Sequence, residues 1–204
     1  KKPKKVTVIE KDNNLAKDLN LRFKEKLNII NSDILRIDET VLFKDKTLVF
    51  GNLPYNISTE ILSKWIINLK DSFWFEHLIL MFQKEVADRI LANYNSSDYG
   101  RLSILVNWKL NIKKVFDIKP AAFNPRPKID SSLLIFSPKK NFYKIKDPKN
   151  LEKITRIFFN NRRKMIKKPF NQVFNGDLKI LEKLNIQLNL RPQNLNFETY
   201  YKIT

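Results

Sequence analysis

One run of four residues combines the groups that chemistry on a nucleobase would need: Asn52, Leu53, Pro54 and Tyr55. An Asn side-chain oxygen and a neighbouring backbone carbonyl could accept both protons of an exocyclic amine and aim its lone pair at an electrophile. An adjacent aromatic ring could clamp the base by stacking, worth roughly 1–3 kcal/mol per base. On spacing alone a tight turn is the favoured interpretation, because Gly51 and Pro54 mark turns and Asn tolerates unusual dihedrals. The chemical interpretation stays open beside it.

The charge of the chain favours an anionic partner. The 204 residues include 39 Lys and Arg against 21 Asp and Glu, a formal net charge of +18. A coding bias towards Lys would spread such a surplus evenly. Residues 139–168 instead hold twelve basic and two acidic residues, a balance of +10. This concentration indicates a phosphate backbone as the partner.

Several classes of function are excluded by composition. The absence of Cys excludes disulfides, thiolate nucleophiles and Cys-ligated metals, and the single His77 excludes a multi-His metal site. No apolar run approaches the roughly 18 residues of a membrane span. We therefore expect a soluble, cytoplasmic protein without a metal.

The elements that must position residues 52–55 alternate between short strands and helices. Strands are expected at 6–9, 27–30, 47–50, 77–82, 115–118 and 132–136, and helices at 13–24, after 58 or 59, at 83–94 and at 102–108. Ser58 or Thr59 is the expected cap of the second helix. This alternation predicts an α/β fold with a mostly parallel sheet and an antiparallel edge hairpin at its end. In such sheets ligands bind at the carboxyl ends of the strands, where residues 52–55 begin.

From Pro148 onward only helical patterns occur. One helical face is apolar and the opposite face is basic; the apolar set is Leu151, Ile154, Phe158 and Met165. Further helices are expected at 177–185 and 196–202. We predict three segments: an α/β domain at 1–138, a basic linker at 139–147 and a helical domain at 148–204 that binds the anionic partner.

Five stretches in order carry a resemblance to a known family: 51–59, 83–89, 99–103, 123–132 and 161–164. Together they resemble the small-subunit rRNA adenine N(6),N(6)-dimethyltransferases. The resemblance implies a Rossmann-like, S-adenosylmethionine-dependent methyltransferase domain with a small all-α C-terminal domain. It also implies an activity in ribosome biogenesis: methyl transfer to the amines of two adjacent adenines near the 3′ end of small-subunit rRNA.

The resemblance also assigns roles to residues around the target base. Asn52 would bind the target amine and border the methyl donor, and the Leu53 and Pro54 backbone would supply the second acceptor. Tyr55 and Phe123 would stack on the two faces of an extruded adenine. For Phe123 the residues alone favour a core position before a Pro-rich turn.

Cofactor and RNA contacts follow from the same resemblance. Glu10 would accept hydrogen bonds from the cofactor ribose, and Asp33 from the cofactor adenine amine. Each has a plain alternative, a solvated strand end for Glu10 and a turn or helix cap for Asp33. The basic residues that would contact rRNA phosphates, or else form a solvated helix face, are Arg156, Arg162, Arg163, Lys164 and Lys167.

The sequence departs from the family in one respect. Gly51, Gly100 and Gly176 are the only glycines, and none forms the Gly-rich loop that follows the family's first strand. We therefore expect that strand and loop to be missing and this chain alone to be inactive. The expected oligomeric state is a monomer, and the expected partner is small-subunit rRNA in a 30S precursor. Two alternatives stay open: a non-catalytic rRNA-binding or ribosome-assembly factor, and a large-subunit rRNA adenine methyltransferase of the macrolide-resistance type.

Overall fold

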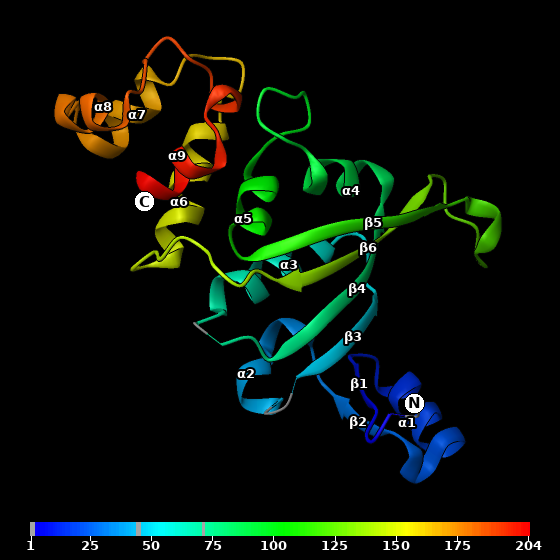
Figure 1. Cartoon of the computed structure of the whole chain (residues 1–204). Coiled ribbons are helices and arrows are strands. Elements are labelled where there is room, and N and C mark those ends of the chain that lie inside the picture. Colours follow the sequence, from blue (N-terminus) through cyan, green and yellow to red (C-terminus); the bar gives the residue numbers. More distant parts are fainter. Residues whose placement is uncertain (1–2, 44–45, 71) are drawn as a thin grey trace. The chain divides into compact units, whose positions relative to one another are not determined.

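The computed structural model describes residues 3–43, 46–70 and 72–204. Contacts divide the chain into two compact units, residues 1–44 and residues 45–204, which are drawn together in Figure 1. Among the described helices none is long and apolar enough to cross a membrane.

The first unit is a small parallel β-α-β arrangement. Strands β1 (Thr7–Glu10) and β2 (Asn28–Asn31) pair in parallel, so that Glu10 lies opposite Asn31. Helix α1 (Asn13–Phe23) begins where the Asp12 carboxylate accepts hydrogen bonds from two backbone N–H groups. The remaining elements of this unit are η1 (Lys24–Lys26), η2 (Ile34–Arg36) and α2 (Glu39–Leu42).

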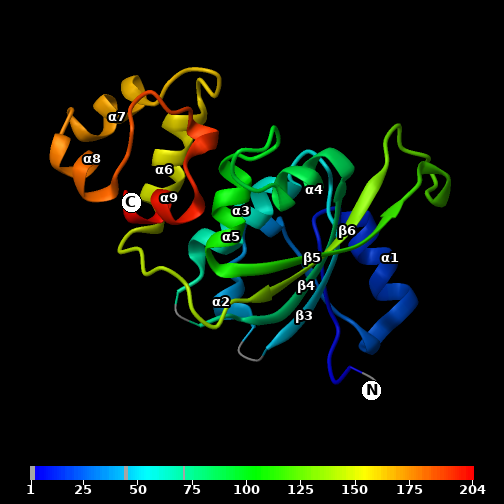
Figure 2. The ribbon, with the colours of Figure 1, turned by 45° about the horizontal axis from the view of Figure 1, so that its top comes forward.

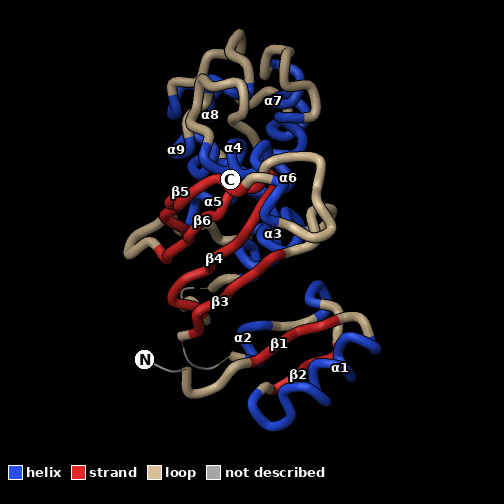
Figure 3. Tube along the Cα trace, turned by 90° about the vertical axis from the view of Figure 1, so that its right-hand side faces the viewer, coloured by secondary structure: helices blue, strands red, loops and turns tan. Residues whose placement is uncertain are grey.

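The second unit is built on a four-stranded sheet in the order β3-β4-β6-β5 (Figure 3). Its strands are β3 (Thr47–Asn52), β4 (Phe75–Gln83), β5 (Leu110–Ile118) and β6 (Ser131–Pro138). The β3/β4 pair is parallel, whereas β6 pairs antiparallel with both β4 and β5. The predicted antiparallel edge hairpin is therefore confirmed. The expectation of a mostly parallel sheet is wrong for this unit, because β6 inserts between β4 and β5.

Three helices cover this sheet: α3 (Ser58–Asn68), α4 (Lys84–Leu91) and α5 (Arg101–Lys109). The covered face carries fully buried alternating residues, such as Leu78 and Leu80 on β4. On the opposite face Leu48 and Phe50 of β3 are exposed. The hydrophobic core therefore lies on one side of the sheet, and packing on that side holds the strand ends in place.

The predicted cap of α3 is wrong. Ile57 occupies the N-cap position without a side-chain hydrogen bond, and Ser58 is already helical. The Ser58 hydroxyl donates to the Tyr55 carbonyl at 3.2 Å, so it ties the helix to the preceding loop instead.

The C-terminal part consists of α6 (Pro148–Phe159), α7 (Lys167–Phe174), α8 (Leu178–Leu184), η4 (Pro192–Asn194) and α9 (Phe197–Lys202). Helices α6 and α9 pack against α5. The helices expected at 177–185 and 196–202 are confirmed, whereas α7 was not predicted. Met165 does not share the apolar face of α6, because that helix ends at Phe159, and Met165 is 58% exposed. The predicted domain boundaries stay a prediction.

Candidate functional site

Two loops leave the four-stranded sheet at the same edge. The register places Asn52 opposite Met81, and the last residues of β4 and β5, Gln83 and Ile118, both lie opposite Ser131. The loop after β3 and the long connection from β5 to β6 therefore start from one edge, as Figures 1 and 2 show. Parallel strands β3 and β4 present their carboxyl ends there, the usual ligand edge of an α/β sheet.

The loop after β3 is fixed by contacts within and beyond the motif. The Ile57 N–H donates to the Pro54 carbonyl at 3.1 Å, which closes a turn. The Tyr55 hydroxyl shares a hydrogen bond of 2.7 Å with the Ser131 hydroxyl at the start of β6. Asn52 is exposed, and the Tyr55 ring is half-buried. An accessible amide at the end of β3 thus precedes a tethered aromatic ring by three residues, so the turn and the chemical interpretation are compatible.

Phe123 lies in the connection from β5 to β6. It follows η3 (Pro120–Ala122), and its N–H donates to the Pro120 carbonyl at 3.2 Å. The ring is half-buried, so Phe123 is not a core residue. Among the residues described, neither Phe123 nor Tyr55 contacts another aromatic ring. Both residues lie on segments that leave the sheet at the same edge, Tyr55 three residues after β3 and Phe123 five residues after β5, and each is partly accessible.

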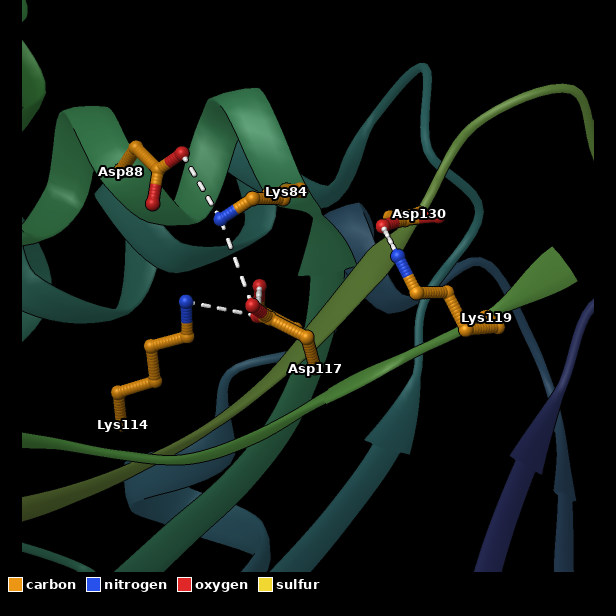
Figure 4. A network of polar contacts seen from close by, with 7 residues as sticks. Lys84, Asp88, Lys114, Asp117, Lys119 and Asp130 are labelled. Atoms are coloured by element: carbon orange, nitrogen blue, oxygen red, sulfur yellow. Dashed lines mark hydrogen bonds and ion pairs between the residues drawn. The ribbon is translucent and has the colours of Figure 1, made fainter.

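A charged network that sequence reasoning missed fastens this edge (Figure 4). The Asp117 carboxylate contacts Lys114 Nζ at 2.7 Å, the Ser132 hydroxyl at 2.6 Å and Lys84 Nζ at 3.4 Å. Lys84 also lies 3.5 Å from Asp88. The hydrogen bonds from Lys114 and Ser132 hold the pKa of the Asp117 carboxyl well below its usual range. The network links the start of α4 to β5 and β6.

A second link closes the base of the long connection. Lys119 Nζ lies 2.6 Å from the Asp130 carboxylate, so the two ends of that connection are joined. The Lys84 N–H donates to the Asp130 carbonyl at 2.9 Å. Lys84 and Asp130 belong to the stretches 83–89 and 123–132, which is the one signal in the sequence that could have drawn attention to them.

Within the first unit, Glu10 and Asp33 stand at the carboxyl edge of β1 and β2. The Glu10 carboxylate accepts from the Asp12 N–H at 2.8 Å. Asp33 contacts Lys11 Nζ at 2.8 Å and accepts from the Leu35 N–H at 3.0 Å, so it does cap a helical turn. Both contacts lower the pKa of the Asp33 carboxyl, Lys11 most strongly. Two carboxylates at the ends of adjacent parallel strands fit the ribose and adenine of a nucleoside cofactor. The described residues offer no Gly-rich turn for the rest of it.

The candidate RNA-binding residues separate into two groups. A groove of about 730 Å³ is lined by Met165 and by five basic residues, Arg163, Lys164, Lys167, Lys168 and Arg191. Arg156 is not among the lining residues and contacts Glu152 at 3.4 Å. Arg162 is half-buried, with its guanidinium hydrogen-bonded to Gln193 and to the Ser96 carbonyl. The structure therefore gathers three of the five predicted residues and adds Lys168 and Arg191.

The chain has a Rossmann-like methyltransferase fold. This fold combines a mixed sheet covered by helices, a ligand edge at β3 and β4, and a helical C-terminal part. The chain belongs to the ribosomal RNA adenine dimethylase family, whose model matches residues 1–204. The family resemblance found in the sequence is thereby confirmed.

Individual relatives and solved structures support the same family assignment. The chain is 64% identical over 203 residues to ribosomal RNA small subunit methyltransferase A of Pelagibacter ubique, covering all of this chain and 78% of that protein. It is 41% identical over 201 residues to the protein of the same name from a Wolbachia of Drosophila simulans, covering 97% and 73%. Among solved structures, a dimethyladenosine transferase from Plasmodium falciparum superposes with a TM-score of 0.80 at 26% identity, covering 98% and 80%. The 23S rRNA methyltransferase ErmE shares the fold, with a TM-score of 0.63 at 18% identity, covering 98% and 82%.

Proposed function

We propose that this chain acts in methyl transfer from S-adenosylmethionine to the exocyclic amines of two adjacent adenines near the 3′ end of small-subunit rRNA. The observation that carries the proposal is the loop after β3, where an exposed Asn52 is followed three residues later by a Tyr55 tethered to β6. Membership of the ribosomal RNA adenine dimethylase family supports the same reaction. Names of relatives that specify the small subunit favour this substrate over the large subunit.

The loop residues would act by orientation and polarisation. The Asn52 side-chain oxygen would accept one proton of the target amine, and a backbone carbonyl would accept the other. The Pro54 carbonyl already accepts from Ile57, so we favour the Leu53 carbonyl for this role. With both protons held, the nitrogen lone pair is directed away from the ring, and no strong general base is needed. When bound, S-adenosylmethionine supplies an electrophilic methyl group.

Two aromatic rings would hold the adenine outside its stack. The Tyr55 ring is fixed by its hydroxyl, and the Phe123 ring leaves the same sheet edge on the long connection. Stacking on both faces would compensate the loss of neighbouring bases, and unpaired RNA makes that loss small. Glu10 and Asp33 would bind the ribose and adenine of the methyl donor.

The basic groove would hold the phosphate backbone of the rRNA. All of its charged lining residues are basic, and four of the five lie within residues 163–168. The half-exposed Met165 and two asparagines in the same lining leave room for a nucleotide as well as phosphates. We propose that the protein works as a cytoplasmic monomer on a precursor of the small subunit during ribosome biogenesis.

Methyl transfer from labelled S-adenosylmethionine to a small-subunit rRNA transcript tests the proposal, with primer extension to locate the modified adenines. Because this chain alone is expected to be inactive, every methyl-transfer assay uses the chain extended by an N-terminal segment that supplies the family's first strand and Gly-rich loop. Asn52→Ala should abolish transfer while leaving the unfolding transition unchanged, because Asn52 is exposed. Asn56→Ala is the matched control, since Asn56 is an exposed Asn of the same loop.

Three results would contradict the proposal. Transfer by Asn52→Ala at the native rate would refute the assigned mechanism, and modification confined to large-subunit RNA would refute the substrate. Tight RNA binding with no affinity for S-adenosylmethionine in calorimetry, both for this chain and for the chain extended by the Gly-rich segment, would favour a non-catalytic assembly factor.

A further inference from the structure

Two adjacent arginines, Arg162 and Arg163, have different surroundings. The exposed Arg163 lines the basic groove. The half-buried Arg162 donates from Nε to the Gln193 side chain at 3.0 Å and from Nη2 to the Ser96 carbonyl at 3.2 Å. Its planar guanidinium therefore joins two segments far apart in the sequence, a geometry that a Lys cannot reproduce.

The same two segments are joined again next to Arg162. Asn95, which has a left-handed φ of 69°, donates its N–H to the Gln193 carbonyl at 2.8 Å. Its side chain accepts from the Asn194 amide at 3.0 Å. The four hydrogen bonds made by Arg162 and Asn95 to Ser96, Gln193 and Asn194 are called here the Arg162 latch. In Figure 2 the loop after α4 correspondingly approaches the segment before α9.

The latch adjoins both sides of the basic groove. Arg162 directly precedes Arg163, which begins one side, and Gln193 lies two residues after Arg191 on the other. The η4 segment that carries Gln193 is itself held to α9, where the Tyr200 hydroxyl donates to the Pro192 carbonyl at 2.8 Å. Arg162 therefore ties the two sides together at one end of the groove, in addition to the hydrogen bond from the Ile166 N–H to the Leu190 carbonyl at 2.8 Å.

The latch also reaches the sheet edge through α4. That helix is eight residues long, or about 12 Å at 1.5 Å per residue, and ends just before the loop that holds Asn95. Its first residue, Lys84, is bound to Asp117 and to the Asp130 backbone at the edge where residues 52–55 lie. A continuous path of packed and hydrogen-bonded elements thus runs from the groove to the methyl-transfer loop.

We propose that Arg162 is a positioning residue: the Arg162 latch sets the spacing of the groove and its distance from residues 52–55, and Arg162 does not bind phosphate. The inference rests on the proposed function, since it concerns how bound rRNA is presented to that loop. Arg162 thereby leaves the set of RNA contacts predicted from the sequence.

Binding of a fluorescent small-subunit rRNA transcript at a series of KCl concentrations separates the two roles. Arg163→Ala removes a phosphate contact, so the slope of log K against log[salt] should fall by about 0.7–0.9. Arg162→Lys keeps the charge but cannot donate in both directions. It should weaken binding roughly 2–10-fold, the equivalent of about one hydrogen bond, with an unchanged slope. Arg22→Lys, at an exposed arginine of α1, is the control and should change neither quantity.

A double-mutant cycle with Gln193→Ala tests the latch itself. The Arg162→Lys/Gln193→Ala double variant should bind RNA no more weakly than whichever single variant binds RNA less tightly. The reason is that both substitutions remove the same hydrogen bond, between Arg162 and the Gln193 side chain. At saturating RNA, Arg163→Ala should recover the native rate of methyl transfer, whereas Arg162→Lys should stay slow because the bound RNA is misplaced.

Several outcomes would overturn the proposal. Native affinity in Arg162→Lys would do so, as would a slope reduced by Arg162→Ala as far as by Arg163→Ala. Additive effects in the cycle would also exclude the latch. If Arg162→Lys lowered only the thermal midpoint, with RNA affinity intact well below that temperature, the role would be structural alone. RNA binding is read without catalysis, so failure of the Asn52 test leaves these results interpretable.

Discussion

Gly51→Ala should displace the loop that carries Asn52. A Cβ at position 51 would lie 2.7 Å from Leu80 Cδ2 and 3.0 Å from Leu53 Cδ2. Carbon atoms in contact prefer about 3.5–4.0 Å, so one side of this contact must move by about 1 Å. Leu80 is fully buried and packed on all sides, so the backbone at position 51 must itself move away from Leu80, and this shift displaces the neighbouring Asn52 and Leu53.

The size of the effect follows from overpacking. An extra methyl group in a packed interior costs about 1–3 kcal/mol, and for a chain of this length each kcal/mol lowers Tm by about 2–4 °C. We expect a Tm lower by about 2–12 °C. A loop shift of about 1 Å near the reacting nitrogen should reduce methyl transfer roughly 100-fold, well beyond the loss of folded protein.

Thermal unfolding and methyl transfer from labelled S-adenosylmethionine measure the two effects on the same samples. Gly100→Ala is the matched control, because a Cβ there would meet its nearest atoms at 3.9 and 4.0 Å, an ordinary contact. Native stability and native activity in Gly51→Ala would refute the packing argument. Equal losses in Gly100→Ala would show that the close approach to Leu80 is not their cause.

Three further results are expected. Tyr55→Phe should lose about 0.5–1.5 kcal/mol of unfolding free energy in urea, because the hydroxyl contact to Ser131 disappears while the stacking ring stays; an unchanged midpoint would contradict this. Lys114 holds the pKa of the Asp117 carboxyl below its ordinary 3.8, so its stabilisation is present above about pH 4 and lost as the pH falls further. Asp117→Asn should therefore flatten the decline of Tm between about pH 5 and pH 2, and an equally steep decline would argue against the network. Phe123→Leu should lower kcat/KM for RNA roughly 5–150-fold through lost stacking, with Tm unchanged, and native kinetics would remove Phe123 from the site.

The sequence predicted those features whose signals are local. Strand ends and the loop after β3 follow from short apolar runs bounded by Gly51 and Pro54, and the structure places them as expected. The edge hairpin followed from the absence of a long helix between residues 118 and 132. Each of these depends on neighbours within a few positions, which a single sequence displays directly.

Features that residue types and their spacing do not mark were missed or misplaced. Ser58 has the composition of a cap, yet its hydroxyl bonds the Tyr55 carbonyl because the loop turns back on the helix. Met165 follows the helical spacing of Phe158, but α6 stops at Phe159 and the chain changes direction. The Asp117 network joins three elements and has no periodic signature at all. Tertiary contacts, unlike local patterns, carry no fixed spacing for sequence reasoning to detect.

The basic segment 139–168 shows what a charge count leaves out. Lys139 donates to the Asn107 carbonyl and is half-buried, which lowers its pKa, while Arg156 contacts Glu152 and Arg162 forms the latch. The cations that share a concave surface are instead the five of the groove, and one of them, Arg191, lies outside that segment. Twelve phosphate contacts would give a log–log salt slope of magnitude about 10, whereas five would give about 4. Clustered positive charge therefore identifies the kind of partner. The number of RNA contacts depends on how many of those basic side chains remain outside hydrogen bonds and ion pairs within the protein.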